Sequence, residues 1–117
     1  MIKVSVMYPN SPGVQFDHDY YREKHLPLIK SRMGAGLKYY TIDKGLSAAA
    51  PGTPPSYVAM CHLMCDSLET YKASFAPSAK EINGDIRNFT GITPVVLISE
   101  VVVENSSRPA TPESVKV

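Results

Sequence analysis

The sequence predicts a single α+β domain with the element order βαββαβ, the ferredoxin-like arrangement, in which four strands form one antiparallel sheet. Three observations support this prediction. Four segments have the patterns of strands, two have the apolar periodicity of amphipathic helices, and the helices follow the first and third strands. With 117 residues, the chain has room for one hydrophobic core and no second domain.

The first strand and the start of the first helix are defined by alternation and by capping residues. Ile2 to Tyr8 alternates apolar side chains with others, as a half-buried strand does. Residues 9–13 are rich in proline, asparagine and glycine and form a loop. Asp17 is a suitable N-cap, and Phe16 and Tyr21 are spaced to form a hydrophobic staple around it.

The end of the first helix depends on a proline. Pro27 lacks the N–H that would bond to the carbonyl of Glu23, so we expect the helix to kink or end near Leu26. Gly34 and Gly36 then close the unit.

Three further strands and a tail complete the chain. The strands are expected at residues 37–46, 57–65 and 94–103, with a proline-containing loop at 47–56. Residues 1–104 therefore make the domain. Serine, proline and glutamate dominate residues 105–117, which we interpret as a tail that is flexible or docks on a partner.

The second helix has a capping signal and an apolar stripe. Asp66, followed by Glu69 three residues later, predicts its start. The stripe keeps a period near 3.5 through Pro77, which indicates a kink or a joint between two helices on the same side. Its members are Leu68, Tyr71, Phe75, Ala79, Ile82 and Ile86. Asn83-Gly84 is a natural stop.

The third and fourth strands are apolar on both faces, although two helices can cover only one face of a four-stranded sheet. An open apolar sheet face on so small a domain would be an exposed patch of the kind that marks association. The sequence therefore predicts a homodimer packed sheet to sheet.

Composition excludes several functional classes. A net charge of +1 with 20% charged residues gives no basic surface for nucleic acid or membranes. No apolar run is long enough to span a membrane, and no signal peptide precedes the first strand. Cys61 and Cys65 would lie roughly 13 Å apart on one strand, which is too far for a disulfide. Two unpaired, buried cysteines are typical of a protein in the reducing cytoplasm. No metal-site spacing or cofactor motif is present, so we expect neither metal nor cofactor.

Two segments carry a resemblance to a known family. Residues 20–28, YYREKHLPL, resemble the first-helix signature of the EthD family and its dimeric α/β-barrel relatives. Residues 85–94, DIRNFTGITP, resemble the same family's approach to its last strand, and 57–65 followed by DSLE fits the third strand and second helix. The resemblance covers about residues 1–103.

This resemblance implies a ferredoxin-like fold that dimerises into an α/β barrel. The family is named for a protein linked to oxidative ether degradation and is associated with oxidoreductase activity. Similar barrels include cofactor-free monooxygenases, muconolactone isomerases and dehydratases. We therefore expect a protein that binds and transforms a small hydrophobic or aromatic catabolic intermediate. Two alternatives remain open: a cofactor-free isomerase or dehydratase, and a non-catalytic metabolite-binding protein.

Two residues of the first helix are the predicted catalytic pair. His25 lies on the apolar face with Tyr21 one turn earlier. A histidine titrates near neutral pH and can transfer a proton. His25 also matches the family's histidine, so we expect it to act as acid/base, with Tyr21 as a hydrogen-bond donor. The alternative is a buried pair with a structural role only.

His62, Phe89 and Asp85 are the candidate substrate-binding residues. His62 alternates with two methionines on the third strand, so it would meet His25 if that face packs on the helices and would lie in the dimer interface otherwise. Phe89 and Asp85 belong to the family-like segment, although Asp85 follows a glycine and could instead brace a turn.

Overall fold

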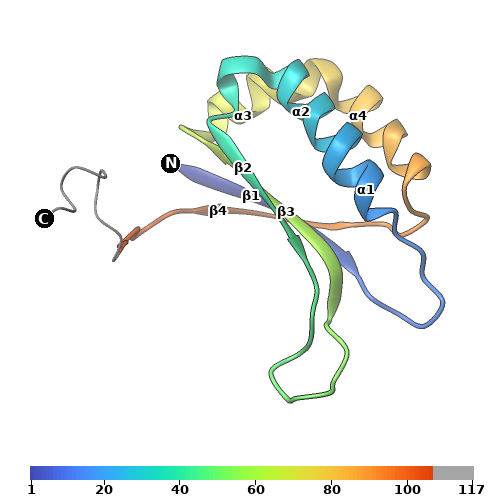
Figure 1. The fold of residues 1–117 in the computed structure, drawn as a ribbon. Helices are drawn as coiled ribbons and strands as arrows, with labels where there is room; N and C mark the ends of the chain where they lie inside the picture. Colours follow the sequence, from blue (N-terminus) through green and yellow to red (C-terminus); the bar gives the residue numbers. More distant parts are fainter. Residues whose placement is uncertain (107–117) are drawn as a thin grey trace, which may run out of the picture.

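A four-stranded antiparallel sheet, with all helices on one of its faces, forms the body of the protein (Figure 1). The computed structural model describes residues 1–106, and most of the predicted tail lies outside them. The strands are β1 (Ile2–Pro9), β2 (Tyr39–Lys44), β3 (Tyr57–Cys65) and β4 (Val95–Glu100), in the order β2-β3-β1-β4. The predicted ferredoxin-like α+β fold is confirmed, with the second and fourth strands shorter than expected.

The helical layer consists of two interrupted units, one after β1 and one after β3. The first contains α1 (His18–Tyr20), the π-helical turn η1 (Tyr21–His25), α2 (Leu26–Met33) and the 3₁₀ turn η2 (Gly34–Gly36). The second contains α3 (Leu68–Phe75), η3 (Ala76–Ser78), α4 (Ala79–Asp85) and η4 (Ile86–Asn88). No helix within residues 1–106 is both long and apolar enough to cross a membrane.

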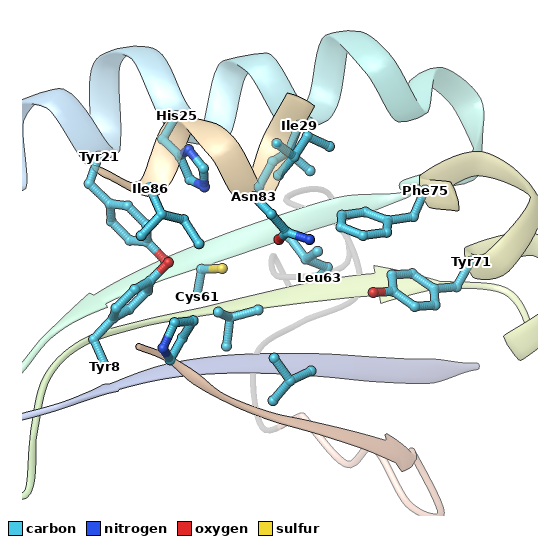
Figure 2. Close-up of a pocket in the computed structure, with 14 residues that line it drawn as sticks. Tyr8, Tyr21, His25, Ile29, Cys61, Leu63, Tyr71, Phe75, Asn83 and Ile86 are labelled. Atoms are coloured by element: carbon cyan, nitrogen blue, oxygen red, sulfur yellow. The ribbon is translucent and has the colours of Figure 1, made fainter. Parts of the chain in front are cut away.

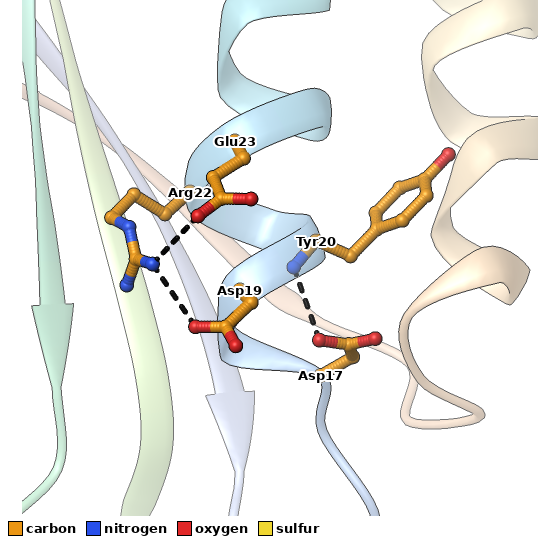
Figure 3. A network of polar contacts seen from close by, with 5 residues as sticks. All are labelled: Asp17, Asp19, Tyr20, Arg22 and Glu23. Carbon is orange, nitrogen blue, oxygen red and sulfur yellow. Dashed lines mark hydrogen bonds and ion pairs between the residues drawn. The ribbon is translucent and has the colours of Figure 1, made fainter.

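The first unit begins as its sequence predicts. The Asp17 carboxylate accepts a hydrogen bond from the N–H of Tyr20 at 3.0 Å (Figure 3). Phe16 and Tyr21 contact each other edge-on, with ring centroids 5.0 Å apart, as a hydrophobic staple requires. Arg22 pairs with Asp19 on the exposed side of the helix, a contact that contributes little to stability.

The sequence predicted a kink or an end of the first helix near Leu26. The helix does not end there, because the chain widens its turn before the proline. The N–H of Leu26 bonds to the carbonyl of Tyr21, five residues back, and the helix then continues through Pro27 to Met33. In an α-helix the Pro27 ring would clash with the carbonyl four residues earlier. We attribute the π turn to relief of this clash, and π turns recur at functional sites.

The second unit differs from its prediction at both ends. Ser67, not Asp66, caps α3 by accepting a hydrogen bond from the N–H of Thr70 at 3.1 Å. The joint at Pro77 is confirmed as the 3₁₀ turn η3. The predicted stop at Asn83-Gly84 is wrong: Gly84 keeps a right-handed helical conformation and α4 reaches Asp85. This extension carries Asp85 on a helix rather than in a turn.

The sheet has one covered face and one open face. Val4, Ala59, Cys61 and Leu63 point toward the helices and are buried in the core. Edge strand β4 is exposed on both of its faces, with Leu97 on the open side retaining 55% of its accessible surface. Cys61 and Cys65 are both buried and unbonded, as expected.

The close approach of η2 to α3 predicts opposite effects for two glycine variants. A Cβ on Gly36 would lie 2.5 Å from the Cβ of Ser74, so Gly36→Ala is expected to lower the free energy of unfolding by about 1–3 kcal/mol. Gly84 is helical with open space around it, so Gly84→Ala should raise stability by about 0.5–1 kcal/mol. Urea denaturation measures both, and a Gly36→Ala protein as stable as the parent would contradict this packing.

Candidate functional site

A cavity of about 170 Å³ lies between the helical layer and the sheet (Figure 2). Most of its lining is aliphatic or aromatic, contributed by strands β1, β3 and β4 and by both helical units. The polar groups that line it are Tyr8, Tyr21, His25, Cys61, Tyr71 and Asn83. The cavity can therefore enclose an apolar body and offers a few polar contacts to orient it.

His25 enters this cavity from the π turn and is held by an acidic partner. Its Nδ1 lies 2.8 Å from Oδ2 of Asp85, a residue 60 positions later in the chain. His25 is 3% exposed, and the side chain of Asp85 is 15% exposed. The hydrogen bond thus joins the two helical units directly above the cavity.

The protonation states of this pair follow from their surroundings. Burial lowers the pKa of His25 below its usual value, and Asp85 offsets this effect only in part. Burial alone would raise the pKa of Asp85, but hydrogen bonds from His25, Tyr20 and Asn88 outweigh it and lower the pKa. At neutral pH a neutral imidazole therefore donates its Nδ1–H to a carboxylate, which leaves the lone pair on Nε2.

The ring nitrogen of His25 that bonds to Asp85 is Nδ1, not Nε2. Since His25 lines the cavity and its Nδ1 is bonded to Asp85, the unprotonated Nε2 is the nitrogen available to a bound molecule. A neutral histidine held in one tautomer by a carboxylate is an arrangement suited to removing a proton from a ligand.

Asp85 is a positioning residue in this structure rather than a lining residue of the cavity. Its Oδ1 accepts hydrogen bonds from the hydroxyl of Tyr20 at 2.7 Å and from the amide of Asn88 at 2.9 Å. Both carboxylate oxygens are thus engaged with protein groups, and Asp85 is placed behind His25 rather than in the lining of the cavity.

Tyr21 lies beside His25 with its ring parallel to the imidazole, at a centroid distance of 5.7 Å and an angle of 15°. Both residues belong to the π turn η1. The Tyr21 hydroxyl is buried and has no hydrogen-bond partner within residues 1–106. Burial raises its pKa far above the usual value, so it stays protonated.

Phe89 packs behind His25 and does not line the cavity. Its ring centroid lies 4.6 Å from that of His25 and 5.0 Å from that of Tyr21. In the structure Phe89 therefore packs against the two catalytic candidates.

His62 lies on the open face of the sheet, away from His25. Its Nδ1 is 2.8 Å from the hydroxyl of Ser5, and its Nε2 is 3.1 Å from a carboxylate oxygen of Asp43. Of the two alternatives for His62, the structure selects the open face, so it cannot contribute to the cavity that contains His25.

Tyr8 and Cys61 line the cavity but were not singled out from the sequence. Tyr8 is one of the alternating apolar residues of β1. That pattern predicts that its side chain is buried but does not indicate a functional site. Burial raises the pKa of the Cys61 thiol to about 11, so it is not a thiolate at neutral pH. Within residues 1–106, no group of three histidine, cysteine or acidic side chains is arranged to hold a metal ion.

Comparisons with known proteins place this chain in a family. A sequence model of the EthD domain matches residues 13–93. An EthD-like protein from Ralstonia eutropha JMP134 is 52% identical with a TM-score of 0.87, and the alignment covers 92% of this chain and 96% of that protein. No curated protein matches the chain significantly.

Two more distant structures share the fold. An EthD family protein from Bacillus halodurans C-125 is 19% identical, with a TM-score of 0.64 and coverage of 86% of this chain and 97% of that one. A protein from Arabidopsis thaliana is 13% identical, with a TM-score of 0.63 and coverage of 91% and 100%. At these identities, the likeness concerns the fold alone.

The Asp85 contact predicts the direction in which the pKa of His25 moves. Asp85→Asn removes the carboxylate that raises the pKa of His25, so the titration midpoint of His25 should fall further below 6.5. NMR titration of the imidazole C–H signals measures this shift. His18 is the internal control, because Asp85 is not among the groups that affect its pKa. A midpoint that rises in Asp85→Asn would contradict the assigned pairing.

Proposed function

The chain belongs to the EthD domain family, and we propose that it is a cofactor-independent enzyme that binds a small hydrophobic or aromatic metabolite and uses His25 as its acid/base. The observation that carries this proposal is the His25–Asp85 pair above an apolar cavity. No relative in the comparisons establishes a reaction for this chain, so the proposal stands on the site.

The size of the cavity supports a small ligand. An engineered apolar cavity of roughly 150 Å³ binds benzene, so a cavity of about 170 Å³ accommodates one ring with a small substituent. The aromatic and aliphatic lining favours an apolar body over a sugar or a nucleotide.

The proposed chemistry begins with proton transfer to Nε2 of His25. The imidazolium that forms is stabilised by the adjacent carboxylate of Asp85, which lies 2.8 Å from Nδ1. Returning the proton to another atom gives isomerisation, and loss of a leaving group gives dehydration. An oxidation would follow if the deprotonated ligand reacts with dioxygen, which is the oxidoreductase form of the proposal.

Replacing His25 separates an enzyme from a metabolite carrier. His25→Gln removes the base and keeps a side chain that can hydrogen-bond, so turnover should fall roughly 10²- to 10⁴-fold while ligand binding persists. A thermal-shift screen of aromatic and lactone metabolites identifies ligands, and product formation from each is then measured. His18→Gln is the matched control, because His18 does not line the cavity. Ligand binding with no turnover by the parent protein would instead show a carrier.

We also propose that the protein is a homodimer packed through the open sheet face. Val95 and Leu97 expose 46% and 55% of their surfaces on that face, where a second copy would cover them.

The dimer has its own test. Leu97→Lys would place a charge in the proposed interface and should convert the dimer to monomers in analytical ultracentrifugation. Leu46→Lys is the control, because Leu46 is 86% exposed in the loop between β2 and β3 and should leave the dimer intact. A parent protein that sediments as a 12.8 kDa monomer at micromolar concentration would refute the dimer.

A further inference from the structure

The cavity carries two tyrosine hydroxyls at one end and no ionised side chain in its lining. We propose that it selects an uncharged carbonyl compound about the size of a single ring, whose oxygen is held by the hydroxyls of Tyr21 and Tyr8 while His25 removes a proton from the adjacent carbon. This inference rests on the proposed role of His25 and adds the substrate class and a residue, Tyr8.

The first observation is the unpaired hydroxyl of Tyr21. Tyr21 is 1% exposed, and its hydroxyl has no hydrogen-bond partner within residues 1–106. The thiol of Cys61 is near enough to interact with this hydroxyl, but a thiol is only a weak hydrogen-bond partner and does not meet the geometry of a hydrogen bond here. Burial of an unpaired hydroxyl is unfavourable. Since Tyr21 lines the cavity, an oxygen atom of a bound ligand can supply the missing acceptor.

The second observation is the position of Tyr8. Its ring meets that of Tyr21 nearly edge-on, with centroids 5.7 Å apart, and both hydroxyls are directed to the same end of the cavity (Figure 2). Tyr8 is 1% exposed, and burial raises its pKa well above the usual value. Both phenols therefore stay protonated and can donate hydrogen bonds to one oxygen.

The third observation concerns charge. The lining contains no lysine, arginine, aspartate or glutamate. His25 is neutral at pH 7, and the carboxylate behind it would repel an anion. A carboxylate or phosphate group would lose its hydration here without gaining a cationic partner, which is strongly unfavourable. The cavity thus excludes anionic metabolites.

The proposed step is an enolisation that needs no oxidant or reductant. Nε2 of His25 takes the proton from the carbon next to the carbonyl, and the electrons of that C–H bond form a carbon–carbon double bond. The π electrons of the carbonyl move to its oxygen, where Tyr21 and Tyr8 stabilise the negative charge. Return of the proton from the imidazolium restores the ketone or completes an isomerisation.

Binding of three ring-sized probes tests the substrate class. By NMR titration, phenol should bind about tenfold more tightly than toluene, since it adds a hydrogen bond to a buried hydroxyl. Benzoate should not bind. Tyr21→Phe should reduce phenol binding to the level of toluene and leave toluene binding unchanged. Tyr8→Phe should weaken the binding of phenol but not that of toluene. The control Tyr39→Phe should change the binding of neither compound. Because Tyr21→Phe deletes an unpaired hydroxyl, it should not destabilise the fold.

Equal affinities for phenol and toluene, binding of benzoate, or unchanged phenol affinity in Tyr21→Phe would overturn the proposal. Deuterium exchange into cyclohexanone in D₂O tests the step itself and should slow in Tyr21→Phe, in Tyr8→Phe and in His25→Gln. If His25→Gln exchanges at the parent rate while the binding preferences hold, the role of His25 fails and the selection of an uncharged oxygen compound stands. Parent-level exchange in both tyrosine variants would remove their role in catalysis.

Discussion

One hydrogen bond, from Nδ1 of His25 to the carboxylate of Asp85, determines how this site is built. It joins the two helical units through residues that are 60 positions apart in the chain. It also determines which nitrogen of the imidazole can contact a ligand. Removing Asp85 would leave the buried imidazole without its hydrogen-bond partner. The bonds from Tyr20 and Asn88 to the same carboxylate keep it ionised and in place.

Two local irregularities in the helices make this contact possible. The π turn before Pro27 keeps the first unit helical and contains both Tyr21 and His25, whose rings are nearly parallel. The continuation of α4 through Gly84 presents Asp85 to His25. Phe89 then packs against both rings of the first unit. The site therefore depends on backbone choices that look unfavourable when each helix is considered alone.

Local chemistry predicted much of this fold, and long-range contacts account for the rest. Alternation in Ile2–Tyr8 predicted β1, and Asp17 predicted the helix start, because these signals act over a few residues. The face of His25 followed from helical periodicity. Its bond to Asp85 did not, since periodicity says nothing about which residue of another helix lies opposite. The face on which His62 lies could not be predicted either. Because β3 is apolar on both sides, its pattern does not show which side packs against the helices.

The central claim is that His25 is neutral and carries its proton on Nδ1, with the Nε2 lone pair directed to the cavity. The most direct measurement is the pair of ¹⁵N chemical shifts of the His25 imidazole at pH 7 in the folded protein. The account predicts a protonated, pyrrole-type Nδ1 and an unprotonated, pyridine-type Nε2. An imidazolium, or a neutral ring with its proton on Nε2, would contradict it.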